Sequence, residues 1–181
     1  MACGITSIDQ TVLDDCGSLG GIFESYGLDC ADFTSATVAS GEITALTVTE
    51  EFTKLVYDDD DTAFYNQEAD RTGNRISFNQ SAFFKFEKLT KEKIAAANAA
   101  SECCCTIWIH RLNSGIDLCQ GLDEDSAGTG VLYSKTKARV TPSVLSDTGD
   151  NADRLEYTIE SVGRKLSLPI ATALDFTDLV V

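Results

Sequence analysis

The sequence predicts a mainly β protein, either a β-sandwich or a partly closed β-barrel, with one flanking α-helix. Seven or more short segments are rich in β-branched and aromatic residues, as strands are. Clusters of Gly, Asn and Asp separate these segments, as expected for turns. Only one segment has strong helix signals. Many short strands with a single helix favour a sandwich or a barrel.

The first 41 residues lack a clear periodicity. Residues 1–32 are rich in Asp, Gly and Cys, and glycines interrupt every short pattern there. We therefore expect an irregular N-terminal arm or a few short strands over residues 1–41, not a packed domain. A single domain is expected over residues 42–181, since 181 residues suit one domain.

Nine segments of the remaining chain have strand-like composition or alternation. In residues 154–162, Leu155, Tyr157 and Ile159 alternate with polar residues. The expected strands are 43–48, 52–57, 63–69, 75–86, 104–111, 116–119, 131–140, 154–162 and 166–170. The expected turns and loops include 58–61, 70–74, 113–115, 123–130 and 141–153. Residues 70–74 contain the Gly and Asn that a hairpin turn favours.

One helix is predicted over about residues 90–101. Thr90 is suited to cap its N-terminus, and Glu92 lies in the first turn, where a negative charge favours the helix dipole. Leu89 and Ile94 occupy the positions of a hydrophobic staple. Five alanines follow, which have the strongest helix propensity, so a slim helix packed against a sheet is expected.

The charge balance disfavours two classes of partner. The chain has 14 Lys and Arg against 29 Asp and Glu, a net charge of −15. Because nucleic-acid affinity comes mainly from cations that neutralise phosphates, general nucleic-acid binding is disfavoured. An anionic membrane surface is disfavoured for the same reason. No apolar stretch is long enough to cross a bilayer, and residues 1–6 lack the features of a secretory signal.

The seven cysteines are an odd number, and Cys103, Cys104 and Cys105 are adjacent. This is a poor disulfide framework, and no cysteine pair has zinc-ligand spacing. We therefore expect free, small hydrophobic thiols in a protein made in a reducing cell, with no bound metal or cofactor.

Catalytic motifs are weak in this sequence. The only histidine, His110, shares a strand face with Thr106 and Trp108 and has no nucleophile motif near it, so a structural role is favoured. Residues 147–149 read Asp-Thr-Gly, as in aspartic proteases, but those enzymes need two such aspartates and this motif occurs once. A dimeric hydrolase is therefore only a remote alternative, and we expect no enzymatic activity.

Two acidic loops and two basic groups are further candidate sites, although a solvated surface is the favoured interpretation of each. Residues 123–125 and 147–153 offer oxygen ligands for calcium, although neither fits an EF-hand. Four lysines lie near the start of the helix, at positions 85, 88, 91 and 93. Lys135, Lys137 and Arg139 alternate, so on a strand they form one positive stripe. This stripe is a candidate contact for acidic segments of another copy, since residues 1–53 contain nine acidic residues and no Lys or Arg.

The order of elements resembles the tail tube (major tail) proteins of tailed bacteriophages. The resemblance covers about residues 42–165. It rests on the segment 83–89 that leads into the Ala-rich helix, the strand around Trp108, the turn 113–115 with the Gly121 segment, and the loop and strand 139–161. The opening residues 1–6, with a second cysteine at Cys16, are also similar to some members.

The resemblance implies a tail-tube-like subunit without catalytic residues. Six copies would form a ring by extending β-sheets between neighbours, and stacked rings would form a tube that conducts DNA during ejection. The expected partners are other copies, other tail or virion proteins and DNA as transient cargo in the lumen, with no membrane. The expected location is the virion tail, after synthesis in the host cytoplasm.

Within this hypothesis, the expected inter-subunit contacts are Asp58, Asp59, Asp60, Asp61, Lys135, Lys137 and Arg139. A loop as long as 58–74 is expected to reach the adjacent ring. The alternatives are another virion component, such as a tail terminator or a capsid accessory protein, or a calcium-binding β-sandwich interaction module.

Overall fold

The computed structural model of the protein describes residues 21–55, 62–86, 89–125, 130–146 and 153–174. Strands and one α-helix, α1, form a β-sandwich that is not a closed barrel. The first elements are β1 (Ile22–Asp29), the 3-10 turn η2 (Cys30–Asp32), β2 (Phe33–Ala39), β3 (Glu42–Val48), β4 (Thr53–Leu55), β5 (Thr62–Thr72), β6 (Arg75–Phe86) and α1 (Lys91–Glu102). The remaining elements are β7 (Thr106–Leu112), β8 (Asp117–Gln120), β9 (Leu122–Glu124), β10 (Val131–Tyr133), β11 (Thr136–Leu145), β12 (Arg154–Gly163) and β13 (Leu168–Pro169).

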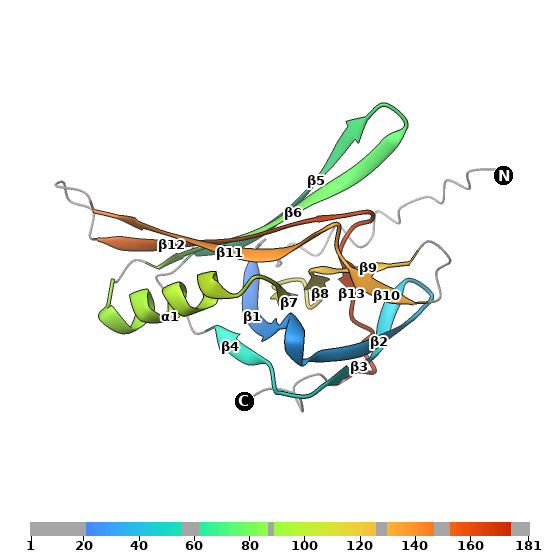
Figure 1. Ribbon diagram of the computed structural model, residues 1–181, viewed down its shortest axis with the longest axis horizontal. Coiled ribbons are helices and arrows are strands. Elements are labelled where there is room, and N and C mark those ends of the chain that lie inside the picture. The colour runs from blue at the N-terminus through green and yellow to red at the C-terminus, as the bar shows by residue number, and fades with distance from the viewer. Residues whose placement is uncertain (1–20, 56–61, 87–88, 126–129, 147–152, 175–181) are drawn as a thin grey trace.

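The main sheet is divided into two layers. Strands β5, β6, β12 and β11 form the upper layer in Figure 1, and β4, β1, β7, β8 and β13 form the layer below it. In the described residues, the two halves are joined by a single pairing of Ala138 with Thr106. The antiparallel hairpin β2–β3 lies below the second layer, and β9 pairs with β10 in a small separate sheet.

Strand β7 separates two hydrophobic cores. Its residues Thr106 to His110 are all buried, which means that both faces of the strand are covered. Ile107 and Ile109 point into a core shared with the β2–β3 hairpin, where Val38 and Ile43 are buried. On the opposite face, Trp108 packs into a core formed with the upper layer. The larger buried side chains of that second core include Phe84, Phe86, Leu155, Tyr157 and Ile159.

The predicted helix is confirmed, with its N-terminus where the sequence indicates. The Thr90 Oγ1 accepts a hydrogen bond from the Lys93 backbone N–H at 3.2 Å, so Thr90 is the N-cap. Ala97 is buried in the core with the upper layer.

The strands predicted at 43–48, 75–86 and 154–162 are confirmed, including the buried alternation of Leu155, Tyr157 and Ile159. The described part of the N-terminal segment forms strands, which was one of the two expected alternatives, but the expectation that it lies outside the packed domain was wrong. Strand β1 pairs with both β4 and β7, and Tyr26 and Leu28 are buried. From residue 22 onward, this segment therefore belongs to the packed domain.

The prediction of one strand over 131–140 was wrong. The chain forms β10 and β11 with a break at Ser134 and Lys135, because β10 pairs with β9 whereas β11 pairs with β12. The Ser134 N–H donates to the Gly121 carbonyl at 3.0 Å across this break. The predicted loop over 141–153 was also wrong in its first part, since β11 continues to Leu145.

Pro142 does not end strand β11. It lies opposite Tyr157 of β12, and beyond Ala138 the described part of β11 has a strand neighbour on one side only. Proline is tolerated at such edges because its missing N–H does not interrupt a ladder.

The hairpin β5–β6 extends beyond the rest of the upper layer (Figure 1). Every residue from Glu68 to Ile76 is exposed, so the outer part of the hairpin has no core on either face. The segment expected as a long loop over 58–74 is therefore largely strand, because residues 62–72 pair continuously with β6. Residues 58–61 lie outside the described residues.

Candidate functional site

The predicted positive stripe is only partly assembled. Lys137 and Arg139 lie on β11 and are exposed, whereas Lys135 lies in the break before this strand. A register shift between Thr136 and Arg139 disturbs the ladder with β12 at the same place. The Lys137 ammonium lies 5.3 Å from the centre of the Tyr133 ring, and Arg139 lies opposite Glu160. The four predicted acidic contacts, Asp58, Asp59, Asp60 and Asp61, lie outside the described residues.

The acidic segment 123–125 is engaged with its own chain. Asp123 is buried, and its Oδ2 accepts a hydrogen bond from the Arg164 N–H at 2.8 Å, while Glu124 forms an ion pair with Lys165. Burial raises the pKa of Asp123 above its ordinary value, against the opposing effect of the backbone hydrogen bonds. Within the described ranges, no three His, Cys, Asp or Glu side chains converge to hold a metal ion. Most of the second acidic loop, residues 147–152, lies outside those ranges, as does the Asp-Thr-Gly motif.

His110 lies in a buried hydrogen-bonded chain between the two layers. Its Nδ1 is 2.8 Å from Ser25 Oγ, and its Nε2 is 2.9 Å from Gln120 Oε1. The Gln120 amide nitrogen donates to the carbonyls of Gln80 and Ile159, so Oε1 is the acceptor that faces the imidazole. His110 therefore carries its proton on Nε2, and Ser25 donates to Nδ1.

Ser25 and His110 are placed like a nucleophile and its base, but these side chains have no access to solvent. Ser25, His110 and Gln120 are each 0% exposed. Burial lowers the pKa of His110 to about 4, and the hydrogen bond to Gln120 opposes this shift only in part. The neutral imidazole stacks on Trp108 and also contacts Tyr65. The favoured structural role for His110 agrees with this geometry, but its partner Ser25, 85 residues away, had no signal in the sequence.

A cleft of about 570 Å³ lies between α1 and the facing strands. Its size and apolar lining are typical of small-molecule sites. The larger lining side chains are Leu55, Phe86, Trp108, Leu155 and Tyr157, and α1 contributes Ala96, Ala97 and Ala100. Lys54, Glu92, Lys93 and Cys103 add polar groups. The Lys93 ammonium lies 5.2 Å from the centre of the Phe86 ring, and Tyr157 lies edge-on to Trp108. The cleft can therefore hold apolar groups of a ligand or of another protein chain.

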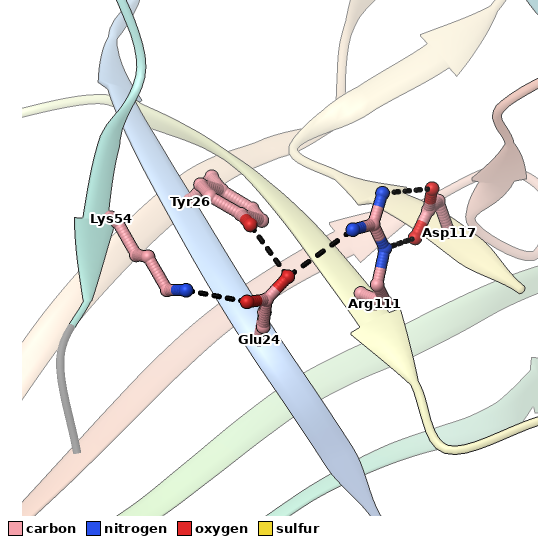
Figure 2. Close-up of polar contacts among 5 residues, drawn as sticks. All are labelled: Glu24, Tyr26, Lys54, Arg111 and Asp117. Atoms are coloured by element: carbon pink, nitrogen blue, oxygen red, sulfur yellow. Dashed lines mark hydrogen bonds and ion pairs between the residues drawn. The ribbon is translucent and has the colours of Figure 1, made fainter. Parts of the chain in front are cut away.

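One ion pair, between Lys54 and Glu24, helps to hold β4, which forms one wall of the cleft, against β1. Figure 2 shows Glu24 at the centre of a row of side chains that crosses β4, β1, β7 and β8. Glu24 forms an ion pair with Lys54 and accepts hydrogen bonds from Tyr26 at 2.6 Å and Arg111 at 3.2 Å. Arg111 also makes a two-pronged contact with Asp117, at 3.0 and 3.2 Å. The row has two positive and two negative groups, so the cations that it contains are neutralised within the sheet.

The row shifts the pKa values of its members. Burial acts to raise the pKa of Glu24, but hydrogen bonds from Lys54 and Tyr26 and nearby positive charges hold it below its ordinary value. Burial and the hydrogen bond to Glu24 raise the pKa of Tyr26 to about 12. The hydrogen bond to Asp117 raises the pKa of Arg111. Glu24 is therefore charged, and Tyr26 is a neutral donor, throughout the physiological pH range.

The expectation that all cysteines are free thiols was wrong. Cys30 and Cys105 form a disulfide across 75 residues of sequence, with their Cα atoms 5.5 Å apart. The reason is the β1–β7 register, which pairs Asp29 with Thr106 and so places the next residues, Cys30 and Cys105, opposite each other. Of the other described cysteines, Cys103, Cys104 and Cys119 are free. Closing so long a loop stabilises the fold by about 4 kcal/mol in the chain-entropy account.

Comparison with known proteins finds no matching family model, no similar curated protein and no similar solved structure. No helix in the described part of the chain has the length and hydropathy that a membrane span needs.

The buried imidazole predicts a loss of stability in acid. The pKa of His110 is about 4 in the folded protein and about 6.5 when unfolded, so the unfolded chain binds the proton more readily. The stability that comes from burying the neutral His110 is therefore fully present above about pH 6.5. As the pH falls toward 4, the free energy of unfolding decreases by about 3 kcal/mol in total. Because the chain has one histidine, NMR can follow its imidazole directly. A titration midpoint near 6.5 in the folded protein would contradict this prediction.

The ion-pair row predicts a second effect on stability. Glu24→Gln removes the charge shared by Lys54 and Arg111, and we expect a loss of about 1–2 kcal/mol in urea unfolding at pH 7. The control is Glu156→Gln, which removes the ion-pair partner of the half-buried Arg154 and should cost less than about 0.5 kcal/mol. Equal losses in the two variants would show that the row has no special role.

Proposed function

We propose that the protein is a self-assembling structural protein of a phage tail that forms the tail tube, in which stacked rings enclose a conduit for DNA. The observation that carries this proposal is the edge strand β5. It has 11 residues and, among the described residues, pairs only with β6. Its ladder with β6 runs from Thr62 to Thr72 without a register shift. A long and regular edge of this kind is a template for pairing with another chain.

The inner half of β5 does little to block such pairing. Proteins protect exposed edges with proline, bulges, very short strands or charged side chains, lysine above all. Strand β5 contains no proline or lysine, the described register has no bulge, and its charged residues Glu68, Asp70 and Arg71 lie in its outer half. The exposed Phe64 of β5 lies beside the half-buried Phe83 of β6, with ring centres 5.0 Å apart. Phe64 is 47% exposed, and Ile76 near the hairpin tip is 51% exposed. Because these apolar side chains are exposed in a single copy, their burial against a neighbouring copy would favour assembly.

A ring also requires a second and different edge, because pairing of β5 with itself would close a two-fold dimer. The strand at the opposite end of the sheet order, β13, has two residues and includes Pro169. Strand β4 is also short, with three residues, but it contains no proline, pairs only with β1 in the described chain and borders the apolar cleft. We therefore favour head-to-tail pairing of β5 with the β4 side of a neighbour, repeated around a ring of six copies.

The charge and the disulfide fit this role. A lumen lined with carboxylates repels phosphates, so a net charge of −15 favours free passage of DNA without binding. Disulfides persist on virions, which leave the reducing cell after synthesis in the cytoplasm. The Cys30–Cys105 bond is therefore compatible with a final location in the virion tail. Other tail proteins are the remaining expected partners.

Two alternatives remain in the proposal. A tail terminator or a capsid accessory protein would also use an exposed edge but would stop at a single ring. A calcium-binding interaction module would need ligands from the acidic loops, and this reading is weakened by Asp123 and Glu124, which contact Arg164 and Lys165 instead.

The edge predicts the effect of added charge on assembly. Asn66→Lys with Glu68→Lys places two lysines on exposed positions of β5, and we expect at least about a tenfold loss of rings and tubes in negative-stain micrographs. Glu42→Lys with Thr47→Lys makes the same charge change on exposed positions of β3 and should leave assembly intact. A wild-type protein that stays monomeric or dimeric at high concentration would contradict the proposal.

Stacking of rings through unlike charges predicts a separate effect. Lys135→Glu with Lys137→Glu reverses two exposed positive charges, which the proposal pairs with acidic segments of the next ring. We expect single rings in place of tubes, and a stronger effect at low salt because salt screens exposed charges. Tubes of normal length from this variant would exclude charge pairing at these lysines.

A further inference from the structure

The cleft beside α1 runs along almost the whole helix. The helix residues that line it recur at intervals of three or four and therefore form one stripe along the axis: Glu92, Lys93, Ala96, Ala97, Ala100 and Cys103. At a rise of about 1.5 Å per residue, this stripe is about 16 Å long. The cleft is therefore elongated, and its volume of about 570 Å³ is that of a ligand pocket.

The middle of the cleft is apolar. Alanines form its helix side, and the rings of Trp108 and Tyr157 lie on its sheet side. The Trp108 Nε1–H donates to Thr106 Oγ1 at 2.9 Å, so the polar atom of the indole already has a partner. A Cβ at Gly27 would lie 2.8 Å from the Trp108 ring, so glycine is needed where this ring lies over β1. An elongated apolar lining of this kind suits a hydrocarbon chain.

The two ends of the cleft differ in charge. At the N-terminal end of α1, the Lys93 Nζ is buried and lies 5.2 Å from the centre of the Phe86 ring. An ammonium has three N–H donors, so Lys93 can bind an anion in addition to its other contacts. The neighbouring Glu92 is exposed, so solvent screens its charge more strongly. At the opposite end, the negative group is Asp29, which pairs with Thr106 in the β1–β7 ladder.

We propose that this cleft binds a free fatty acid, with the carboxylate at Lys93 and the hydrocarbon chain along α1 toward Cys103. Lys54 also lines the cleft, but its ammonium pairs with Glu24. Burial of the chain and the charge-assisted contact at Lys93 both favour binding. One copy supplies all of these residues, so ligand binding requires no assembly and is independent of the proposed tube.

Trp108 gives a direct readout of the cleft, because it is the only tryptophan in the chain and lines the site. The probe is cis-parinaric acid, a fatty acid whose conjugated chain accepts energy from a nearby tryptophan. Titration of the full-length protein should quench Trp108 emission to saturation at one probe per chain, and palmitic acid should displace the probe. Hexadecanol has a chain of the same length with a neutral head, and it should compete about tenfold less well. Absence of saturable quenching, or equal competition by the two compounds, would overturn the proposal.

A variant of the cation tests where the carboxylate lies. Lys93→Gln should weaken palmitic acid by about tenfold and hexadecanol by less than about twofold, since only the acid uses the charge. The matched control is Lys91→Gln, which removes an exposed lysine of the same helix outside the cleft and should leave both affinities unchanged. An equal loss for both compounds in Lys93→Gln contradicts a carboxylate site at this lysine.

A second variant tests the path of the chain. Ala100→Phe fills the middle of the cleft and should weaken both compounds by at least about tenfold. Ala99→Phe makes the same change at an exposed position outside the lining and should bind as the wild type does. Circular dichroism shows that each variant is folded. Wild-type affinity in folded Ala100→Phe would exclude binding along α1.

Discussion

The fold depends on strand β7, because its two faces lie in two different environments and both are buried. Five consecutive residues, Thr106 to His110, are buried, and their side chains alternate between the two cores. One face supplies Ile107 and Ile109 to an entirely apolar core. The other face is mixed, because Thr106 and His110 flank Trp108 there and need hydrogen-bond partners. Those partners come from β1, β8 and β11, so the polar groups of β7 specify which strands lie around it.

The sequence predicts elements with strong local signals and misses features that depend on long-range register. The alternation of residues 154–162 and the cap at Thr90 are local patterns, and both are confirmed. The break between β10 and β11 is missed because Ser134 and Lys135 do not resemble a turn, and the break comes from a change of partner strand. Ser25, which contacts His110, and Cys30, which bonds Cys105, lie on or beside β1. Neither contact can be inferred until β1 is known to pair with β7.

The same reasoning explains which parts of the candidate sites could be predicted. A positive stripe requires only that three alternating residues share a strand, and this condition fails at Lys135. The cleft and the row around Glu24 combine residues from α1 and at least four strands, so no local pattern marks them. In the Glu24 row, two of the chain's 14 cations lie beside partly buried carboxylates, which reduces at this place the repulsion that the net charge causes.

The two ends of β7 are constrained by different chemistry. At its C-terminal half, His110 and Arg111 are held by hydrogen bonds to β1 and β8 that leave little freedom. At its N-terminal end, the strand is tied to η2 by the Cys30–Cys105 disulfide, which lies in the first core with Ile107 and Ile109. The bond and the hydrogen bonds of His110 act on opposite faces of the strand. Both the register of β7 with β1 and the separation of the two cores are therefore fixed at this one strand.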